Sequence, residues 1–416
     1  MNTPAPVVGE RRPRLVFVNR FYAPDLAATS QMLGGVARGL AARGLEIFVV
    51  TSRQRYEDAA ADLPSSQVLD SVRVRRVWST RFGRLRALGR LLDYLSFHAS
   101  ALVELLWLLR AGDRVVAMTD PPMLSVTVWV ACRLRRAHLL NWLQDLFPEV
   151  ARELGFGSIP AAVHRLLLAL RDRSLRAAEC NVTLGERMRE YVASRGVAPA
   201  RLAVIPNWAD GVAIRPMAAD RSQLRHRLGL DGRFVVGYSG NLGMAHDVDA
   251  LLVAARELRD DASLVFLLSG GGSGMRRLQS EAHANALPNL RFLPYQAAED
   301  LGDSLAAADV HLVSLRPELE GLIVPSKTYG VLAAGRAVTF IGDDDGEIAR
   351  LLRQHGCGVS VESGERLAAA LRTLRADPAT VESMGLRARV AFDAGFSCAT
   401  VVERWQSLLA SGFSHR

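Results

Sequence analysis

The sequence predicts an α/β protein built as two doubly wound domains that face each other across a cleft. Short runs of β-branched and aromatic residues alternate with longer helical patterns along the whole chain, which is typical of βαβ units and a parallel sheet. The chain has 416 residues, more than a single hydrophobic core usually serves, so two domains are expected. The alternation stops in a turn-rich stretch near the middle and starts again at Phe234.

The first half is expected to form six strands, at residues 15–19, 46–51, 72–77, 114–118, 139–143 and 181–183. Helical patterns fill the intervals between them. The clearest covers residues 30–43, where apolar residues recur at near-helical spacing from Met32 to Leu40 and Gly44 follows as a stop signal. The first domain is predicted to comprise residues 1–208.

The second half is expected to form five strands, at residues 234–239, 264–268, 290–293, 310–313 and 337–341. The segment from Ile205 to Pro216 is rich in residues that favour turns, so it is interpreted as the interdomain linker. The second domain is predicted to comprise residues 209–395. A C-terminal unit, residues 396–416, carries a helix at about 400–411 that is expected to pack back on the first domain through Trp405.

The composition favours a partner that carries several negative charges. The net charge is +8 and the pI is about 9.8, which fits nucleic acid, an anionic membrane surface or a phosphorylated substrate. Nucleic acid is disfavoured because aromatic residues make up only 6% and do not alternate with basic ones. The four cysteines lie far apart without a CxxC pair, so neither a zinc site nor a disulfide framework is expected, and a reducing cytoplasm fits.

The segment 81–110 has two interpretations. Eight arginines and two acidic residues lie between Arg73 and Arg110, with leucines along one stripe. This pattern fits a basic amphipathic helix on an anionic membrane surface and equally an ordinary helix that packs on the sheet. Neither a signal peptide nor a spanning helix is expected, because residues 1–14 lack an apolar core and no 18 apolar residues run uninterrupted.

Two glycine-bearing loops follow strands of the second domain. Residues 237–247 include Gly240, Asn241, Gly243 and His246, and a helix that starts near the end of this loop would point its free N–H groups at an anion. The alternative is a tight turn between a strand and a helix. Residues 269–274 include Gly270 and Gly271 and allow the same two interpretations, but a P-loop is excluded because no Gly-Lys-Ser/Thr follows.

Lys327 is the only lysine in a chain with 51 basic residues. It follows Pro325 and Ser326, and Ser326 is expected to cap a helix that begins here. A cation in the first turn is unfavourable for a helix, so a bound anion such as a diphosphate is expected beside it. The alternatives are a chance survivor in an arginine-rich composition and a solvated lysine.

Two segments of the first domain are expected at the same cleft. Residues 21–30 connect a strand to a helix, and the hydroxyls of Thr29 and Ser30 are interpreted as helix caps or phosphate contacts. Asp145 lies at the end of a strand, where it can orient or deprotonate an acceptor hydroxyl, or merely cap a neighbouring turn.

Together these segments resemble the retaining, metal-independent glycosyltransferases of family 4, which have the GT-B fold, and most closely the bacterial branch that builds O-antigen, colanic-acid or other exopolysaccharides. The resemblance covers some 400 residues. It rests on the order and spacing of Phe21-Tyr-Ala-Pro-Asp25 with Ala-Thr-Ser-Gln31, Gln144-Asp-Leu-Phe-Pro-Glu149, Ile205-Pro-Asn207, Tyr238-Ser-Gly-Asn-Leu-Gly243, and Glu320-Gly321 with Pro325-Ser-Lys-Thr-Tyr329 and Leu332-Ala-Ala-Gly335.

The resemblance implies that the second domain binds a nucleotide-sugar and the first an acceptor. It implies diphosphate contacts from the loop at Gly240 to Gly243 and from Lys327, with residues 27–29, including Ala28 and Thr29, approaching from the first domain. Glu320 would contact the donor sugar. The region of Gly270, Gly271 and Tyr295 would lie near the base, and the motif residues Ser326, Thr328 and Tyr329 would complete the donor site.

The chain departs from the family pattern in three places, which involve four residues. Gly330 stands where the second glutamate of the family's pair is usual, which puts ribose recognition by a carboxylate in doubt. Asn241 and His246 stand where arginine and lysine are frequent, which leaves Lys327 as the main cation. Gln144 stands where relatives often carry histidine.

The sequence therefore predicts an enzyme that transfers a sugar, with retention, from a nucleotide donor, most simply UDP-linked, to a lipid-linked saccharide at the cytoplasmic face of the bacterial plasma membrane. No metal or cofactor and no nucleic-acid partner is expected, and peripheral membrane contact would come from segment 81–110. The alternatives are a nucleotide-sugar epimerase of the same fold and a non-enzymatic basic binder of membrane or nucleic acid.

Overall fold

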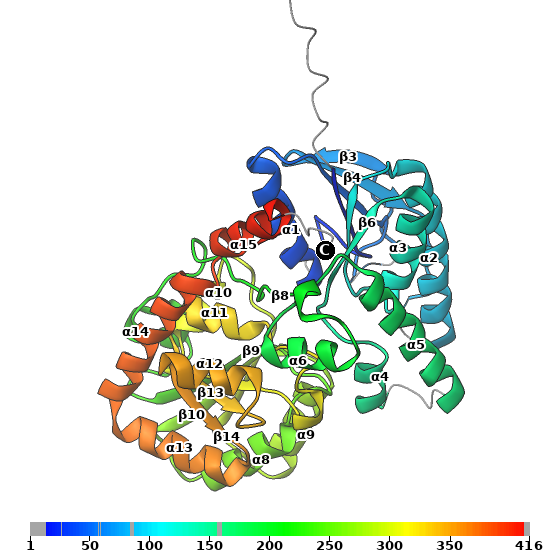
Figure 1. The fold of residues 1–416 in the computed structure, drawn as a ribbon. Coiled ribbons are helices and arrows are strands. Elements are labelled where there is room, and N and C mark those ends of the chain that lie inside the picture. Colours follow the sequence, from blue (N-terminus) through cyan, green and yellow to red (C-terminus); the bar gives the residue numbers. More distant parts are fainter. Residues whose placement is uncertain are drawn as a thin grey trace, which may run out of the picture.

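The computed structural model describes residues 14–25, 27–56, 58, 60–83, 87–155 and 160–411. These residues form two α/β lobes, each built around a mainly parallel sheet, as the sequence predicted (Figure 1). The predicted domain boundary at residue 208 falls between the last strand of the first sheet and the first strand of the second. Parts of three predicted regions lie outside the described residues: 1–13 of the N-terminus, 84–86 of the basic segment and 412–416 of the C-terminal unit.

The first sheet has the strand order β3-β4-β2-β1-β5-β6-β7-β8. Its strands are β1 (Leu15–Val18), β2 (Ile47–Ser52), β3 (Ser66–Leu69), β4 (Val72–Val77), β5 (Arg114–Ala117), β6 (His138–Trp142), β7 (Cys180–Thr183) and β8 (Leu202–Val204). All six strands predicted for this half are present. The additional strands β3 and β8 are a half-exposed antiparallel edge and a strand of three residues, so neither has the continuous apolar run that marks a buried strand.

The helices of the first lobe are α1 (Ala28–Ala42), α2 (Ala87–Leu108), α3 (Leu124–Arg135), α4 (Glu149–Glu153), α5 (Ala161–Ala177) and α6 (Glu186–Ser194). Helix α2 packs on the sheet through Phe97, Ala101 and Leu105, which are fully buried in one apolar cluster with Val16 and Val50. Because these positions are spaced four residues apart, they form a single buried stripe.

One described helix, over Leu88–Leu108, is long and apolar enough to cross a membrane when only length and composition are considered. Its mean hydropathy is 1.3 and only 22% of the window is buried. The sequence analysis expected no spanning helix because His98 and Glu104 interrupt the apolar run, but they do not lower the mean hydropathy below the level of such helices. The buried stripe nevertheless makes this helix part of the first lobe.

The second sheet has the strand order β11-β10-β9-β12-β13-β14. Its strands are β9 (Phe234–Asn241), β10 (Leu264–Gly271), β11 (Leu290–Leu293), β12 (Val310–Ser314), β13 (Ala337–Ile341) and β14 (Gly358–Val361). The helices are α7 (Gln223–Arg227), α8 (Val248–Glu257), α9 (Ser273–Ala284), α10 (Leu301–Ala306), α11 (Lys327–Ala333), α12 (Glu347–His355), α13 (Gly364–Ala376) and α14 (Pro378–Gly395). Five of these strands were predicted; β14 was not, because a Gly-Val-Ser-Val run carries little apolar signal.

Strands β9 and β10 extend into the two segments that the sequence analysis treated as loops. Their pairing continues through Gly240 with Gly270 and Asn241 with Gly271. A Cβ on Gly270 would lie 2.0 Å from the carbonyl oxygen of Gly240, and the φ of Gly270 is +130°. Only glycine fits here. Gly270 therefore allows the ends of β9 and β10 to approach each other closely.

The last helix, α15 (Cys398–Ala410), returns to the first lobe, as predicted (Figure 1). Trp405 is fully buried, with its ring centroid 6.2 Å from that of Phe17 and 5.0 Å from that of Trp142. Arg43, which directly follows α1, donates a hydrogen bond to Gln406 at 3.0 Å. Although α15 follows the second lobe in the sequence, it therefore completes the hydrophobic core of the first lobe.

Candidate active site

The candidate site lies where the carboxyl ends of the two sheets face each other. Asp145 follows β6 of the first sheet, and it forms an isolated antiparallel bridge with Ile323 of the second lobe. Next to it, the backbone N–H of Leu146 donates to the carbonyl of Leu322 at 3.0 Å. The loop that carries Asp145 and the loop that leads to Lys327 are thus hydrogen-bonded across the cleft.

Lys327 begins α11 and points toward the end of β9. Its Nζ contacts the Tyr238 hydroxyl, the Asn241 carbonyl oxygen at 3.3 Å and Nε2 of His246 at 3.3 Å. Nζ also lies 4.1 Å from the centroid of the Tyr238 ring. Within the described residues, no carboxylate forms an ion pair with it. Burial without a counter-charge lowers the pKa of Lys327 to about 7.

His246 is an uncharged acceptor in this arrangement. Its Nδ1 lies 2.7 Å from the carbonyl oxygen of Ser314, and because a carbonyl only accepts, Nδ1 must carry the proton. Nε2 is then free to accept from Lys327. Burial, followed by the charge of Lys327, lowers the pKa of His246 to about 4. This histidine therefore does not supply the positive charge that relatives often carry here, and Lys327 remains the cation of the site.

Tyr238 is a member of this cluster that the sequence analysis did not select. Its hydroxyl donates to the Asn241 carbonyl at 2.9 Å and so presents its oxygen to Lys327. The ring is only 2% exposed, and burial raises the hydroxyl pKa. Sequence alternation marks Tyr238 as a core residue of β9, and only its place two residues before Gly240 gave a signal of function.

The glycine-bearing segments border a cavity of about 520 Å³ beside this cluster. Gly243 and His246 line it, as do the first residues of α8 and α9. Arg277 and Arg316 line it together with their ion-pair partners Asp249 and Glu318.

Two helix N-termini meet at this cavity, which favours anions, although Asp247 already accepts from the Ala250 N–H of α8 at 2.9 Å and the Gly274 N–H of α9 donates to the carbonyl of Leu242 at 2.8 Å. Tyr295, 59% exposed, flanks the opposite side of Gly271, where an added Cβ would lie 3.1 Å from its ring.

The structure corrects three predictions for the segment around Lys327. Ser326 makes no side-chain capping bond, because its backbone already has helical dihedral angles. The Thr328 hydroxyl is fully buried and donates to the carbonyl of Pro325 at 2.9 Å. Tyr329 is 1% exposed and its ring packs on Phe396 with centroids 5.2 Å apart. The side chains of Thr328 and Tyr329 thus face the interior of the second lobe.

Glu320 lies at the start of the loop that leads to Lys327. Its Oε2 accepts from the backbone N–H of Glu347 at 3.2 Å, at the beginning of α12, while its Oε1 is buried without a hydrogen-bond partner. Burial raises the pKa of Glu320 to about 7, and the charges of Asp343 and Glu347 add to this effect. Because Oε1 of Glu320 makes no hydrogen bond within the described part of the chain, it can form one with a ligand.

Asp145 opens onto the cleft from the first lobe. Its backbone N–H donates to the Thr119 hydroxyl at 3.4 Å. The carboxylate remains accessible to solvent, but the dense cleft walls remove part of its hydration and, with the charge of Asp120, raise its pKa to about 6. A carboxylate with this pKa is suited to exchange a proton with a hydroxyl near neutral pH.

At the start of α1, neither predicted hydroxyl caps the helix. Ala27 is the N-cap residue and has no side-chain capping bond. Ser30 is buried and donates to the carbonyl of Asp25 at 3.0 Å, whereas Thr29 accepts a long bond of 3.5 Å from Asn19. The carboxylate of Asp25 already accepts from the Ala27 N–H at 2.7 Å, while Ala28 is exposed and Thr29 is half-buried at the start of α1.

The neighbours of Asp145 hold the fold together. Gln144 and Asn207 exchange two side-chain hydrogen bonds of 3.0 and 2.9 Å, which tie the end of β6 to the interdomain linker. Glu149 is paired with Arg171 in the interior and accepts from the Tyr191 hydroxyl at 2.6 Å. Gln144, which stands where relatives often carry histidine, thus has a structural partner in the linker.

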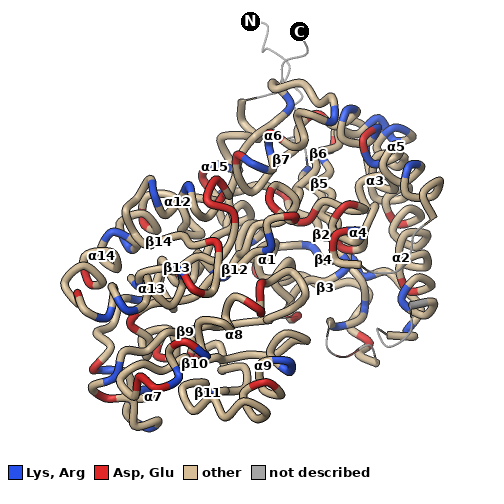
Figure 2. The backbone as a smooth tube through the Cα atoms, turned by 90° about the horizontal axis from the view of Figure 1, so that it is seen from below, with Lys and Arg blue, Asp and Glu red and all other residues tan. Residues whose placement is uncertain are grey.

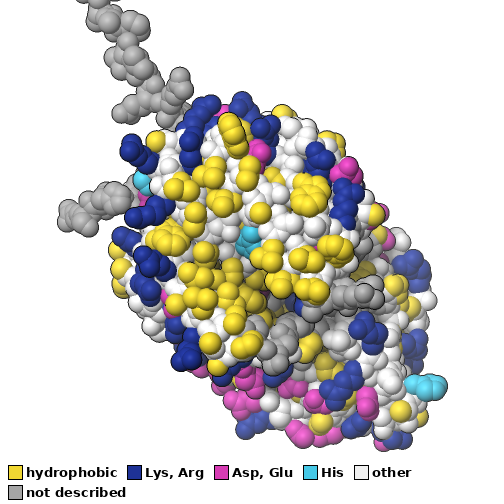
Figure 3. All heavy atoms as spheres, turned by 90° about the vertical axis from the view of Figure 1, so that its right-hand side faces the viewer, with side chains coloured by type: hydrophobic (Ala, Val, Ile, Leu, Met, Phe, Trp, Pro, Cys, Tyr) yellow, Lys and Arg dark blue, Asp and Glu magenta, His cyan; other side chains and the backbone are white. Residues whose placement is uncertain are grey.

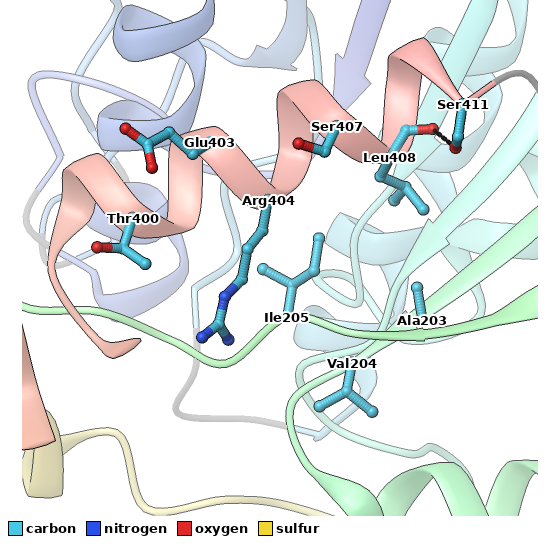
Figure 4. A pocket seen from close by; sticks show the side chains of 9 residues that line it. All are labelled: Ala203, Val204, Ile205, Thr400, Glu403, Arg404, Ser407, Leu408 and Ser411. Atoms are coloured by element: carbon cyan, nitrogen blue, oxygen red, sulfur yellow. Dashed lines mark hydrogen bonds between the residues drawn. The ribbon is translucent and has the colours of Figure 1, made fainter. Parts of the chain in front are cut away.

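A second hollow, of about 560 Å³, lies between α15 and the end of the first sheet (Figure 4). Arg404 points from the helix toward Ile205, and the only hydrogen bond among the side chains drawn runs from Ser411 to the carbonyl of Leu408. None of the predicted site residues lines this hollow. It is therefore separate from the cluster around Lys327.

Comparison with known proteins agrees with this geometry. Residues 28–208 match the Glycosyl transferase 4-like domain and residues 220–391 match the Glycosyl transferases group 1 domain. The chain belongs to the family 4 glycosyltransferases. The two matches fall on the two lobes, and the enzyme class predicted from the motifs is confirmed, which sets aside a non-enzymatic binder.

Curated relatives of this glycosyltransferase include two proteins named for cell-surface polysaccharides or glycosyl transfer. It is 28% identical over 373 residues to a colanic acid biosynthesis glycosyl transferase, WcaI, of Escherichia coli (strain K12), covering 84% of this chain and 89% of the relative. It is 27% identical over 252 residues to a glycosyltransferase of Pseudomonas aeruginosa, WbjE, covering 60% of this chain and 62% of that one.

Solved structures confirm the GT-B fold. The sucrose-phosphate synthase of Thermosynechococcus elongatus superimposes with a TM-score of 0.78 at 17% identity, over 97% of this chain and 99% of that chain. HepE of Anabaena in complex with UDP-glucose gives a TM-score of 0.70 at 17% identity, over 96% and 99%. At this identity the likeness concerns the fold alone.

Proposed function

We propose that this glycosyltransferase transfers a sugar from a UDP-linked donor to a lipid-linked saccharide during the synthesis of a cell-surface polysaccharide, with retention of configuration and without a metal ion. The names of WcaI and the nucleotide bound in HepE support the product class and the donor. We place the enzyme at the cytoplasmic face of the plasma membrane, where an activated donor and a lipid-linked acceptor can meet.

The observation that carries the proposal is the position of Lys327. Lys327 begins a helix, its partners among the described residues are uncharged, and an added Cβ on Gly240 would lie 4.0 Å from its Nζ. A cation in this position is stabilised when a diphosphate binds. Charge that develops on the leaving phosphate is then balanced by this ammonium and by backbone N–H groups, which is electrostatic stabilisation by a preformed site. Asp145 from the other lobe would hold the acceptor hydroxyl.

Replacement of Lys327 by alanine tests this assignment. We expect Lys327→Ala to lower kcat by about 10²–10³-fold, as for other losses of a transition-state donor, while the melting temperature changes little. Lys327→Arg should recover only part of the activity, because a planar guanidinium does not fit a point-charge contact. Equal losses of activity and stability in Lys327→Ala would contradict the proposal.

The nucleotide is tested by calorimetric titration with UDP, GDP and ADP. We expect UDP to bind most tightly and EDTA to leave turnover unchanged. A preference for GDP would correct the donor, since one relative is named as a GDP-mannose-dependent mannosyltransferase. The alternative of an epimerase is tested by supplying UDP-sugar alone: conversion of the donor sugar without an acceptor would replace transfer by epimerisation.

A further inference from the structure

The outer side of α2 is apolar along its whole length. Its exposed residues recur every three or four positions and so form one stripe opposite the buried one. Trp107 is 84% exposed and Leu88 69%. The stripe consists of Leu88, Leu91, Leu92, Leu95, Ala99, Val103 and Trp107.

The apolar surface continues over the two neighbouring helices. Helix α3 packs beside α2, and α5 packs beside α3. Leu134 of α3 is 65% exposed and Leu166 of α5 is 58% exposed. Figure 3 shows hydrophobic side chains gathered over this side of the molecule, with basic side chains toward its margin. We call the exposed apolar side chains of α2, α3 and α5 the apolar face. Soluble monomers rarely expose so much contiguous apolar surface without a partner.

The charges of these three helices fit an anionic surface. Together they carry seven arginines and three acidic residues, and Figure 2 shows several of the basic positions along α5. Each acid is already bonded: Asp93 accepts from Phe82 N–H, Glu104 pairs with Arg75 at 3.0 Å, and Asp172 pairs with Arg171. Arg171 is buried and paired with Glu149 and Asp172, so it does not reach the surface. The exposed arginines can meet an approaching phosphate without a competing free carboxylate on the described helices. They are Arg133, Arg135, Arg165, Arg173 and Arg176.

Helix α2 cannot leave the first lobe to span a bilayer without unmaking its core. Besides the buried stripe, Asp93 accepts from the Thr80 hydroxyl at 2.7 Å and from the N–H groups of Phe82 and Gly83, each at 3.0 Å. These bonds fix the first turns of α2 to the end of β4. Helix α2 is thus held as part of the first lobe and does not cross a bilayer in this arrangement.

The apolar face also has a definite orientation toward the cleft. Helix α2 follows β4, so its first turns, with Leu88 to Leu95, lie at the carboxyl edge of the first sheet. Asp145 follows β6 at this same edge. A leaflet in contact with Leu88 to Leu95 would therefore lie near the mouth of the cleft.

We propose that the apolar face of α2, α3 and α5 inserts into one leaflet of an anionic bilayer, with Trp107 and the leucines among the acyl chains and the arginines at the phosphates. This inference rests on the proposed function for the identity of the acceptor: a saccharide on a membrane lipid would reach Asp145 without leaving the leaflet. Apolar burial supplies most of the affinity, so the binding should resist salt.

Flotation with vesicles tests the insertion. The probe is phosphatidylcholine vesicles with and without phosphatidylglycerol, in low salt and in 1 M NaCl. We expect the full chain to float with the anionic vesicles in both salts, and Leu91→Asp/Leu95→Asp to bind at least tenfold less. The matched control is Leu386→Asp/Val390→Asp on α14, with the same spacing and exposures of 65% and 69%, which should bind like the wild type.

Depth is measured by quenching of tryptophan fluorescence with lipids brominated on their acyl chains. Vesicle-dependent quenching should be present in the wild type and largely lost in Trp107→Phe. Equal flotation of both double variants, loss of binding in 1 M NaCl, or a wild-type dimer that only Leu91→Asp/Leu95→Asp disrupts would each overturn the proposal; the last would make a second copy of the chain the partner.

UDP titration of the same variants separates the two proposals. Normal UDP binding by Leu91→Asp/Leu95→Asp, together with lost flotation, supports insertion by a correctly folded enzyme. A wild type that floats but binds none of the three nucleotides would contradict the proposed donor and leave the membrane face standing. A wild type that binds UDP but does not float with vesicles would contradict the membrane insertion and leave the proposed donor standing.

Discussion

Lys327 can be observed alone, because it is the only lysine in the chain. A sample labelled with ¹³C at the lysine ε-carbon gives a single side-chain signal from this residue. We expect that signal to titrate with a midpoint near the pKa of about 7 that burial imposes. UDP should move the midpoint upward, because a diphosphate favours the charged form. A midpoint near 10 without ligand would show that the ammonium is solvated.

The rate should follow a bell-shaped dependence on pH. Asp145, with a pKa raised to about 6, is deprotonated above that pH, and Lys327, with a pKa lowered to about 7, is protonated below it. We expect kcat/KM to rise through pH 6 and to fall above pH 7, since this constant reports the free enzyme. The fall in kcat should lie at higher pH. Asp145→Asn should remove the acid limb, and an unchanged limb in that variant would point to another acid, such as Glu320.

The sequence indicated some of these residues and misjudged others for identifiable reasons. Lys327 could be selected because it is a single lysine among arginines. Asp145 could be selected because it is a polar residue that follows a buried strand. Thr328 and Tyr329 were selected because a motif does not tell which side of a short helix faces the core. Tyr238 was missed because a buried aromatic in a strand is ordinary, and its role depends on where Lys327 arrives from a distant part of the chain.

At the scale of elements, the pairing of β9 with β10 depends on Gly270. Its Cβ would meet the Gly240 carbonyl at 2.0 Å with φ at +130°, so we expect Gly270→Ala to lower the free energy of unfolding by about 1–3 kcal/mol and to weaken UDP binding. Gly34→Ala is the control, since Gly34 lies within α1 with nothing within 4 Å of an added Cβ; it should stabilise by about 0.5–1 kcal/mol. Chemical denaturation measures both, and equal effects would contradict the argument.

Central strands were predictable because they are continuous apolar runs between turn signals, whereas β3, β8 and β14 were not, because they are edge strands or short ones. The close pairing of the two glycine-bearing segments could not be predicted from the sequence either. A glycine-rich run in a sequence looks like a loop, and only the register of two strands shows that Gly240 and Gly270 are neighbours.

At the scale of the whole molecule, α15 makes the first lobe depend on the end of the chain. Trp405 is fully buried against Phe17 and Trp142. Trp405→Ala should therefore cost about 3–5 kcal/mol of unfolding free energy and expose the apolar side of α1. Trp107→Ala, at a site 84% exposed, should change stability little. If both variants unfold at the wild-type denaturant concentration, α15 does not complete this core.

The pairing of β9 with β10 also affects the thermodynamics of nucleotide-sugar binding. Flexible phosphate loops lose conformational freedom when a ligand orders them, and this loss opposes association. Here Gly240 and Asn241 are already fixed in a sheet, so the corresponding entropy is lost during folding. We therefore expect the second lobe to lose little conformational entropy when the nucleotide binds. Most of the conformational change on binding should occur in the first lobe, on which the acceptor is expected to bind.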